Sequence, residues 1–342
     1  MMNNTQQHIL IVPPLDKSEA CIVTGCKESL EKLGHKVSVF NTEAWVPVCS
    51  ALQNLPVTLA HQDALGSQGM ELISGAVVAV VESQHIDIVL GFPQSPLTSS
   101  SREKMQARGI VTVCWMTEEY ASFPYWRKAI ECCDVVATIQ HEPFISELSV
   151  LGHVPVYLPF AAKSACCTPV VTHTAAEGMI AVLGDASDEM ANALSSHTGR
   201  GMVLWGDGWE KYEQLVPYYQ GKLQSLTRSE RKALYRDAAI IVNIHSTDVG
   251  TGDSVNMETF AIASCGGFQL VDKRTLMEGM FSYDELVMFE SAEELSELLT
   301  EFIDDRNARL EYARNAQKLV LAKHTYEQRM ESLLQAIAEA IK

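Results

Sequence analysis

The chain alternates short apolar, β-branched runs with amphipathic segments along its whole length, and this alternation is the strongest constraint on its fold. The apolar runs of the first half are HILIV, HKVSVF, IDIVLGF, IVTVCWM, DVVATIQ and VPVYLPF. Those of the second half include MIAVL, GMVLW, AIIVNIH and GFQLVD. Strands separated by helices at this spacing indicate βαβ units with parallel sheets. The sequence therefore predicts an α/β fold with doubly wound sheets.

The length and one irregular stretch predict the domain organisation. A chain of 342 residues is too long for one ordinary core and suits two domains. The stretch PFAAKSACCTPVVTHTAAEG interrupts the alternation with small residues, Thr and Pro, which is typical of a connection. We expect a first domain over residues 1–160, a linker over 161–178, a second domain over 179–322 and a C-terminal helix over 323–342.

Charge and cysteine usage limit the partners and the compartment. The net charge of −17 disfavours nucleic acids and anionic membranes as partners. The nine cysteines form no C-x-x-C pair, so we expect reduced thiols in the cytoplasm and no zinc ribbon. The longest apolar run, ISGAVVAVV, is too short to span a membrane, and the N-terminus lacks the basic segment of a signal peptide. The sequence leaves open whether the protein forms a homodimer.

The segment GTGDSVNMETFAIASCGGFQL, residues 250–270, places a polar loop with glycines directly before a predicted helix. The amides of a first helical turn lack partners and carry partial positive charge, so they can bind a phosphate. Gly250 and Gly252 would let the backbone approach a ligand closely, and Ser254 would cap the helix or donate to the phosphate. An ordinary helix start has the same composition and is the alternative.

Four features of the second half follow one another in order: the strand ending in NIH, the VNxxTF helix, the CGGFQLVD turn and strand, and the closing HTYEQRM. As a set, these features resemble the CgeB-type glycosyltransferases, which belong to the wider group of GT-B nucleotide-sugar transferases. Together they extend over roughly residues 202–334. The first half is similar more loosely, through ILIV, IDIVLGFP, IVTVCWMTEE and VPVYLPFA.

The resemblance implies a GT-B fold, in which two Rossmann-like domains face a cleft and the C-terminal helix crosses back to the first domain. It implies a hexosyl or related sugar transferase with a nucleotide-sugar donor on the second domain. The acceptor, on the first domain, would be a hydroxyl of a cell-surface or flagellar protein or glycan. No Asp-x-Asp metal signature occurs, so we expect neither a metal site nor a cofactor beyond the nucleotide-sugar substrate.

Site residues follow from the resemblance and from the ends of the predicted strands, where ligands of such sheets bind. We expect Glu118 and Glu119, after IVTVCWM, and Asp253, near the donor sugar, to be catalytic. The expected donor-binding residues are Gly184, Asp185, Gly206, Lys222, Leu223, His245, Gly252, Ser254, Val255, Asn256 and Glu258. Among these, Lys222 and Leu223 belong to the loop where the family reads the base through main-chain groups.

The sequence departs from the family pattern at the expected ribose carboxylate. Many GT-B transferases carry two acidic residues eight positions apart, and these positions fall here on Asp253 and Ala261. Glu258 lies one helical turn before Ala261 and can substitute, although CgeB relatives often have arginine there. These departures leave open a non-catalytic GT-B-like binding or scaffolding subunit. A sugar-nucleotide epimerase would need a better acid–base set than the sequence offers.

Overall fold

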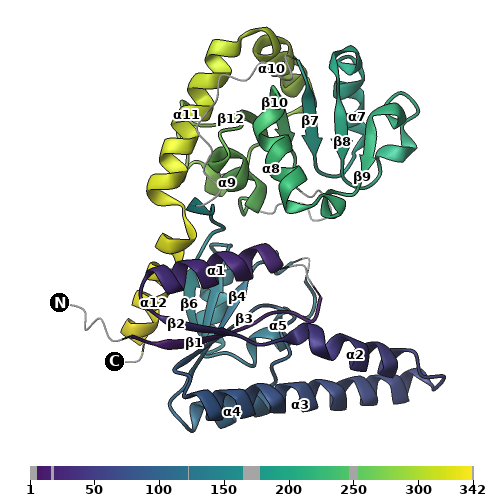
Figure 1. Ribbon diagram of the computed structural model, residues 1–342. Helices are drawn as coiled ribbons and strands as arrows, with labels where there is room; N and C mark the ends of the chain where they lie inside the picture. Colours follow the sequence, from purple (N-terminus) through teal and green to yellow (C-terminus); the bar gives the residue numbers. More distant parts are fainter. Residues whose placement is uncertain (1–5, 17–18, 122, 165–177, 246–252, 341–342) are drawn as a thin grey trace. The chain divides into compact units, whose positions relative to one another are not determined.

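The structure is a computed structural model that describes residues 6–16, 19–121, 123–164, 178–245 and 253–340 (Figure 1). The chain divides into two compact units. The first unit comprises Met1–Pro159 and Tyr326–Lys342, and the second unit comprises Phe160–Thr325. Most of the expected linker, residues 161–178, lies outside the described residues.

The first unit contains a six-stranded parallel sheet in the order β2-β1-β3-β4-β5-β6. Its strands are β1 (His8–Val12), β2 (Lys36–Val39), β3 (Ile88–Gly91), β4 (Val111–Met116), β5 (Val135–Thr138) and β6 (Val154–Tyr157). All six coincide with apolar runs predicted as strands. The order of the strands reverses between β1 and β3, and this switch point is where sheets of this kind bind ligands.

Helices cover both faces of the first sheet (Figure 1). They are α1 (Ala20–Lys32), α2 (Val46–Gln53), α3 (Leu59–Gln84), α4 (Ser99–Gln106), α5 (Trp126–Ile130), α6 (Phe144–Val150) and α12 (Tyr326–Ala340). Ile73 and Val77 of α3 pack with Leu10 and Val12 of β1, whereas α1 and α12 lie together on the opposite face. α3 is long and apolar enough to cross a membrane by length and composition. The absence of a membrane span therefore stays a prediction.

The second unit contains another six-stranded parallel sheet, in the order β12-β11-β10-β7-β8-β9. Its strands are β7 (Ile180–Leu183), β8 (Val203–Trp205), β9 (Tyr219–Gly221), β10 (Ile240–Asn243), β11 (Gln269–Asp272) and β12 (Val287–Phe289). β9 and β12 were not predicted from the sequence. The two sheets confirm the predicted α/β class with two Rossmann-like domains.

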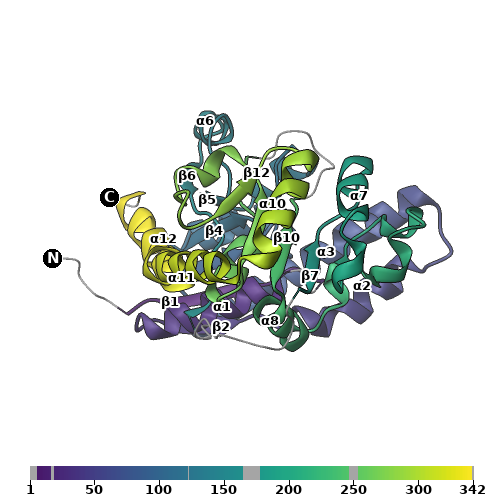
Figure 2. The ribbon, with the colours of Figure 1, turned by 90° about the horizontal axis from the view of Figure 1, so that it is seen from above.

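The helices of the second unit also form two layers. They are α7 (Asp188–Ser195), α8 (Arg228–Asp237), α9 (Met257–Ser264), α10 (Ala292–Asp304) and α11 (Arg306–Lys323). Leu194 of α7 and Leu295 of α10 pack with Val182 and Val242 on one face, where Figure 2 shows α10 beside β10. α8 and α9 pack on the other face of the sheet. Helices α8 and α9 thereby flank the carboxyl ends of β7 and β10.

The C-terminal helix α12 belongs to the first unit and packs against α1. Its contacts include an ion pair between Lys32 and Glu327 and a hydrogen bond of 2.8 Å from Arg329 Nε to the Pro159 carbonyl oxygen. A Cβ atom placed on Gly25 would lie 2.7 Å from the ring of Tyr326, which is buried. The absence of a side chain at Gly25 therefore allows the first and last helices of this unit to meet.

We expect Gly25→Ala to destabilise the first unit by roughly 1–3 kcal/mol, because the added methyl group overlaps the Tyr326 ring. Gly75→Ala in α3 is the control, since a Cβ atom there meets nothing within 4 Å. The control should be neutral or stabilising by up to about 1 kcal/mol. Urea denaturation measures both variants, and equal midpoints would contradict the proposed close contact.

Candidate functional site

The strand order of the second sheet reverses between β7 and β10, so the switch point lies between these two strands. Ligands of doubly wound sheets bind outside the carboxyl ends of the strands at this point. Gly184 follows β7, Gly206 follows β8 and His245 follows β10. The structure thus brings three of the predicted donor-binding residues to one edge of the sheet.

Positions Gly184 and Gly206 must be glycine because the main chain is closely packed around them. Their φ angles are +137° and +146°, a region that favours glycine. A Cβ atom on Gly184 would lie 2.6 Å from the carbonyl oxygen of Ile244, and one on Gly206 would lie 2.0 Å from that of Gly184. The loops after β7, β8 and β10 therefore touch one another directly, which brings the side chains on them close together.

Asp185, Asp207 and Lys222 form a connected group at the same edge. The Asp207 amide donates to Asp185 Oδ1 at 2.8 Å, and Lys222 Nζ lies 3.0 Å from Asp207 Oδ1. The lysine side chain is 65% exposed, so this ion pair is solvated and weak. Lys222 can leave Asp207 for a phosphate at little cost.

Asn256 caps helix α9, with its Oδ1 accepting the Thr259 amide at 2.9 Å. Ser254, which the sequence suggested as the cap, lies two residues earlier and is buried. Asn256 takes the role because its Oδ1 reaches N3 of the helix, while its Nδ2 donates to Asn243 Oδ1 at 2.8 Å. The amides of Met257 and Glu258, at the first two helical positions, precede the first intrahelical hydrogen bond.

His245 holds the segment before α9 in place. Its Nε2 accepts the Asn256 amide at 2.9 Å, and its Nδ1 lies 2.6 Å from Asp272 Oδ1. The proton of the neutral imidazole is therefore on Nδ1. Burial alone would raise the pKa of Asp272, but the hydrogen bond from His245 and the charge of Arg274 together lower it. His245 is thus a positioning residue, and it occupies one of the amides that the sequence analysis offered to a phosphate.

Arg231 of α8 supplies a cation that the sequence analysis missed. Its Nη1 donates to Glu258 Oε1 at 2.9 Å, and its Nη2 donates to the Leu223 carbonyl oxygen at 2.8 Å. Both side chains of the ion pair are largely buried, with 21% and 15% exposed. Arg231 thereby links two predicted donor-binding residues, Leu223 and Glu258. Nothing in RSERKALYRD distinguishes it from its basic neighbours until the fold places α8 beside α9.

The remaining residues of the predicted loop differ in accessibility. Asp253 is exposed, and its carbonyl oxygen accepts the Leu276 amide at 3.4 Å. Val255 is buried in the core of the second unit. Gly252 lies outside the described residues. In the described ranges no group of three or more His, Cys, Asp or Glu side chains is arranged to hold a metal ion.

In the first unit, Glu118 and Glu119 follow β4, but their side chains have different partners. Gln94 Nε2 lies 3.5 Å from Glu118 Oε1, whereas Glu119 accepts a hydrogen bond from Gln140. Burial raises the pKa of Glu118, and the nearby Asp16 carboxylate raises it further. The raised pKa means that Glu118 keeps its proton to a higher pH than an ordinary surface carboxylate does.

Glu19, before α1, is a buried carboxyl group that the sequence analysis did not single out. It accepts a hydrogen bond of 2.7 Å from Thr117 Oγ1. Burial raises its pKa to about 7, the Thr117 hydrogen bond opposes this, and the charges of Glu118 and Asp16 raise it further. In the sequence, Glu19 is one more acid at a helix start. Only the arrangement of β1 and β4 shows that it belongs to a cluster of three carboxyl groups.

The raised pKa of Glu19 predicts a pH-dependent stability. As the pH rises from about 4.5 to 7, the unfolded chain ionises before the folded protein, so stability is lost over this range. We expect Glu19→Gln to remove this loss and to stabilise the protein near pH 8 by roughly 2–3 kcal/mol. Near pH 4.5 the variant and the parent should be equal. Urea denaturation of the parent protein and the variant at both pH values measures the difference in their free energies of unfolding. An equal difference at the two pH values would contradict the prediction.

Comparisons with known proteins agree with this architecture. Residues 188–335 match the family described as glycosyl transferase-like. No curated protein sequence matches the chain significantly. Among solved structures, sucrose-phosphate synthase from Thermosynechococcus elongatus has 12% identity and a TM-score of 0.63, covering 98% of this chain and 99% of its own. HepE of Anabaena in complex with UDP-glucose has 13% identity and a TM-score of 0.62, with coverages of 98% and 100%.

A glycosyltransferase from Rickettsia africae is also similar, with 12% identity, a TM-score of 0.61 and 99% of both chains covered. At these identities the structures establish a common fold, and the family match supports the predicted enzyme class, a glycosyltransferase. The match contains α9, Arg231 and His245. The chain therefore has the GT-B fold, and its residues 188–335, from α7 into α12, match a glycosyl transferase-like family.

Proposed function

We propose that the protein transfers a sugar from a nucleotide-sugar donor, held at the carboxyl edge of the second sheet, to a hydroxyl group of a protein acceptor. The acceptor is a cell-surface or flagellar protein held by the first unit. The reaction uses neither a metal ion nor a cofactor beyond the donor itself.

The observation that carries the proposal is the start of α9 at the switch point of the second sheet. There the first-turn amides of Met257 and Glu258 open α9, and the side chain of Glu258 binds the guanidinium of Arg231. Amides at a helix start together with a cation are suited to a diphosphate. HepE, which shares the fold, has been solved with UDP-glucose, and this supports a nucleotide-sugar ligand.

The chemistry requires that the bond between the sugar carbon and the acceptor oxygen forms while the bond to the diphosphate oxygen breaks. The negative charge that develops on the leaving diphosphate is stabilised by the Met257 and Glu258 amides. The acceptor proton passes to a carboxylate of the first unit, for which Glu118 and Glu119 are the candidates. Glu258, which Arg231 binds through Oε1, would accept a hydrogen bond from a ribose hydroxyl through Oε2. Asp253 would act near the donor sugar.

A non-catalytic binding subunit is the second candidate, and two observations favour it. Ala261 stands where many GT-B transferases have a carboxylate, and the Asn256 amide is already occupied by His245. Release of UDP, GDP, CMP or ADP from the corresponding sugar nucleotide in the presence of acceptor protein separates the two functions. A donor-induced thermal shift without turnover would favour the binding subunit.

We expect Met257→Pro to weaken donor binding by about 10- to 100-fold, because one amide donor to the diphosphate is lost. Proline is tolerated at the first helical position, and Asn256, with φ −67° and ψ 162°, already has the conformation that precedes proline. Met257→Ala removes the same side chain but retains the amide, so it should bind the donor like the parent protein. Thermal shift and calorimetry with the sugar nucleotide that stabilises the parent protein measure this difference.

The proposal for the donor site fails if Met257→Pro and Met257→Ala bind this sugar nucleotide with equal affinity. It also fails if no sugar nucleotide stabilises the folded parent protein.

A further inference from the structure

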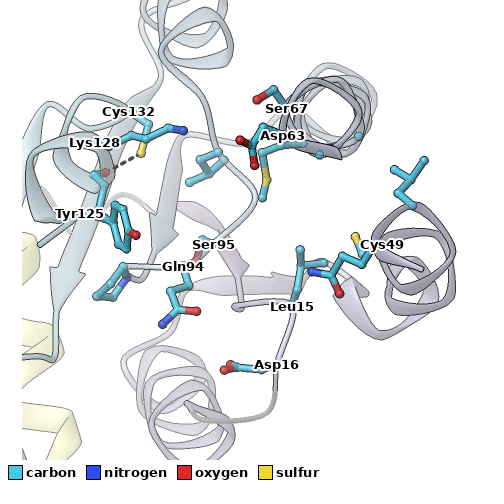
Figure 3. Close-up of a pocket in the computed structure, with 18 of the residues that line it drawn as sticks. Leu15, Asp16, Cys49, Asp63, Ser67, Gln94, Ser95, Tyr125, Lys128 and Cys132 are labelled. Atoms are coloured by element: carbon cyan, nitrogen blue, oxygen red, sulfur yellow. Dashed lines mark hydrogen bonds between the residues drawn. The ribbon is translucent and has the colours of Figure 1, made fainter. Parts of the chain in front are cut away.

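The first unit contains a cavity of about 1120 Å³, which we call the first-unit cavity (Figure 3). Its floor is formed by Leu15 and Asp16, after β1, and by Gln94 and Ser95, after β3. One wall is formed by α2 and α3, and the other by residues 123–132. The cavity therefore lies at the switch point of the first sheet, where a ligand of a doubly wound fold is expected.

The walls of the first-unit cavity combine apolar side chains with side-chain amides. Leu52, Met70 and Phe123 supply apolar surface, and Gln53, Gln62 and Gln94 supply amides that both donate and accept hydrogen bonds. This combination suits a polypeptide, whose side chains need apolar contacts and whose backbone needs both donors and acceptors. The volume is at the upper end of the range for small-molecule pockets, so there is room for several residues.

The charges around the first-unit cavity favour a cationic occupant. Asp16 and Asp63 line it, and Lys128 is the only basic residue among the described lining residues. Figure 3 shows Asp63 on the α3 wall and Lys128 on the opposite wall. Glu118 lies beside the floor through its contact with Gln94. Residues 37–101, which include α2 and α3, contain no Lys or Arg but contain Glu43, Asp63, Glu71, Glu82 and Asp87.

We propose that the first-unit cavity binds a segment of the acceptor polypeptide that carries Lys or Arg side chains near the hydroxyl to be glycosylated. The inference rests on the proposed function for the identity of the polypeptide as acceptor. Carboxylates on the floor and on the α3 wall attract the basic side chains, and the same charges repel an acidic or phosphorylated segment. The cavity thereby selects the acceptor by charge as well as by shape.

The first test fills the cavity. Gly66 lies in α3 and lines the cavity, and a Cβ atom there meets nothing within 4 Å, so Gly66→Phe would occupy the space without breaking the helix. Gly75→Phe is the matched control, since Gly75 is on the same helix, equally unobstructed, and outside the cavity lining. The probe is a fluorescent decapeptide of alternating Lys and Ser, and fluorescence anisotropy with the full chain measures its affinity.

We expect the Lys-Ser peptide to bind the parent protein at least about tenfold more tightly than a matching Glu-Ser peptide. Gly66→Phe should weaken this binding at least about tenfold, whereas Gly75→Phe should leave it unchanged. Equal binding of the two peptides overturns the proposal, as does equal behaviour of the two phenylalanine variants. Binding of maltoheptaose that Gly66→Phe abolishes, with no peptide binding, would also overturn it and assign the cavity to a glycan.

The second test removes charge. We expect the double variant Asp16→Asn and Asp63→Asn to weaken binding of the Lys-Ser peptide about tenfold, in a salt-dependent way. The control Glu297→Gln and Glu301→Gln removes two exposed carboxylates from α10 of the second unit and should have no such effect. An equal loss in both double variants would mean that the peptide responds to net charge alone, and would overturn the proposal.

The sugar-nucleotide thermal shift, measured on the same variants, separates this inference from the proposed function. Cavity variants that no longer bind the peptide but still show the sugar-nucleotide thermal shift support both the inference and the proposed function. Peptide binding in the cavity of a protein that no sugar nucleotide stabilises would retain the cavity as a cationic-peptide site and reject the transferase.

Discussion

The hydrogen bond from the Asn256 amide to His245 Nε2 joins the end of β10 to the start of α9, and the proposed donor site depends on it. Around it, the buried Asn243 side chain donates to Thr259 Oγ1 at 3.0 Å and to Gln269 Oε1 at 3.1 Å. Buried polar groups are costly when unpaired, so this network permits one placement of α9 against β10 and β11. The first-turn amides are consequently fixed in direction before any ligand arrives.

The cost of this arrangement is that few groups remain for a ligand. The Asn256 amide is occupied by His245, Arg231 is engaged by Glu258 and Leu223, and Lys222 is paired with Asp207. In the proposed site a donor would therefore use the first-turn amides and draw Lys222 away from its solvated pair with Asp207. The acidic character of the chain, with a net charge of −17, makes these positive groups more important.

The fold was largely predictable because buried parallel strands are continuous apolar runs, and the ten runs predicted as strands are strands in the structure. β9, with the sequence YQG, contains no apolar run, whereas β12, with the sequence VMF, is apolar but was not predicted as a strand. At the site, the positions of Gly184 and Gly206 were predictable from the strand ends. The reason why glycine is required at these two positions was not predictable, because it is the close contact between neighbouring loops.

Side-chain roles were harder to predict than positions. Glu258 was expected near a ribose, but its ion pair with Arg231 depends on the packing of α8 beside α9, which no local pattern encodes. Glu19 differs from other helix-start acids only through its burial beside Thr117. Such roles depend on residues far apart in the sequence, with 98 positions separating Glu19 from Thr117.

The most direct test of the donor site is amide hydrogen exchange of the intact protein with and without the sugar nucleotide that stabilises it. The account predicts that the Met257 and Glu258 amides, which no intrahelical bond protects, exchange at least about tenfold more slowly when the donor is bound. Protection confined to other segments, with the first turn of α9 exchanging as before, would contradict it.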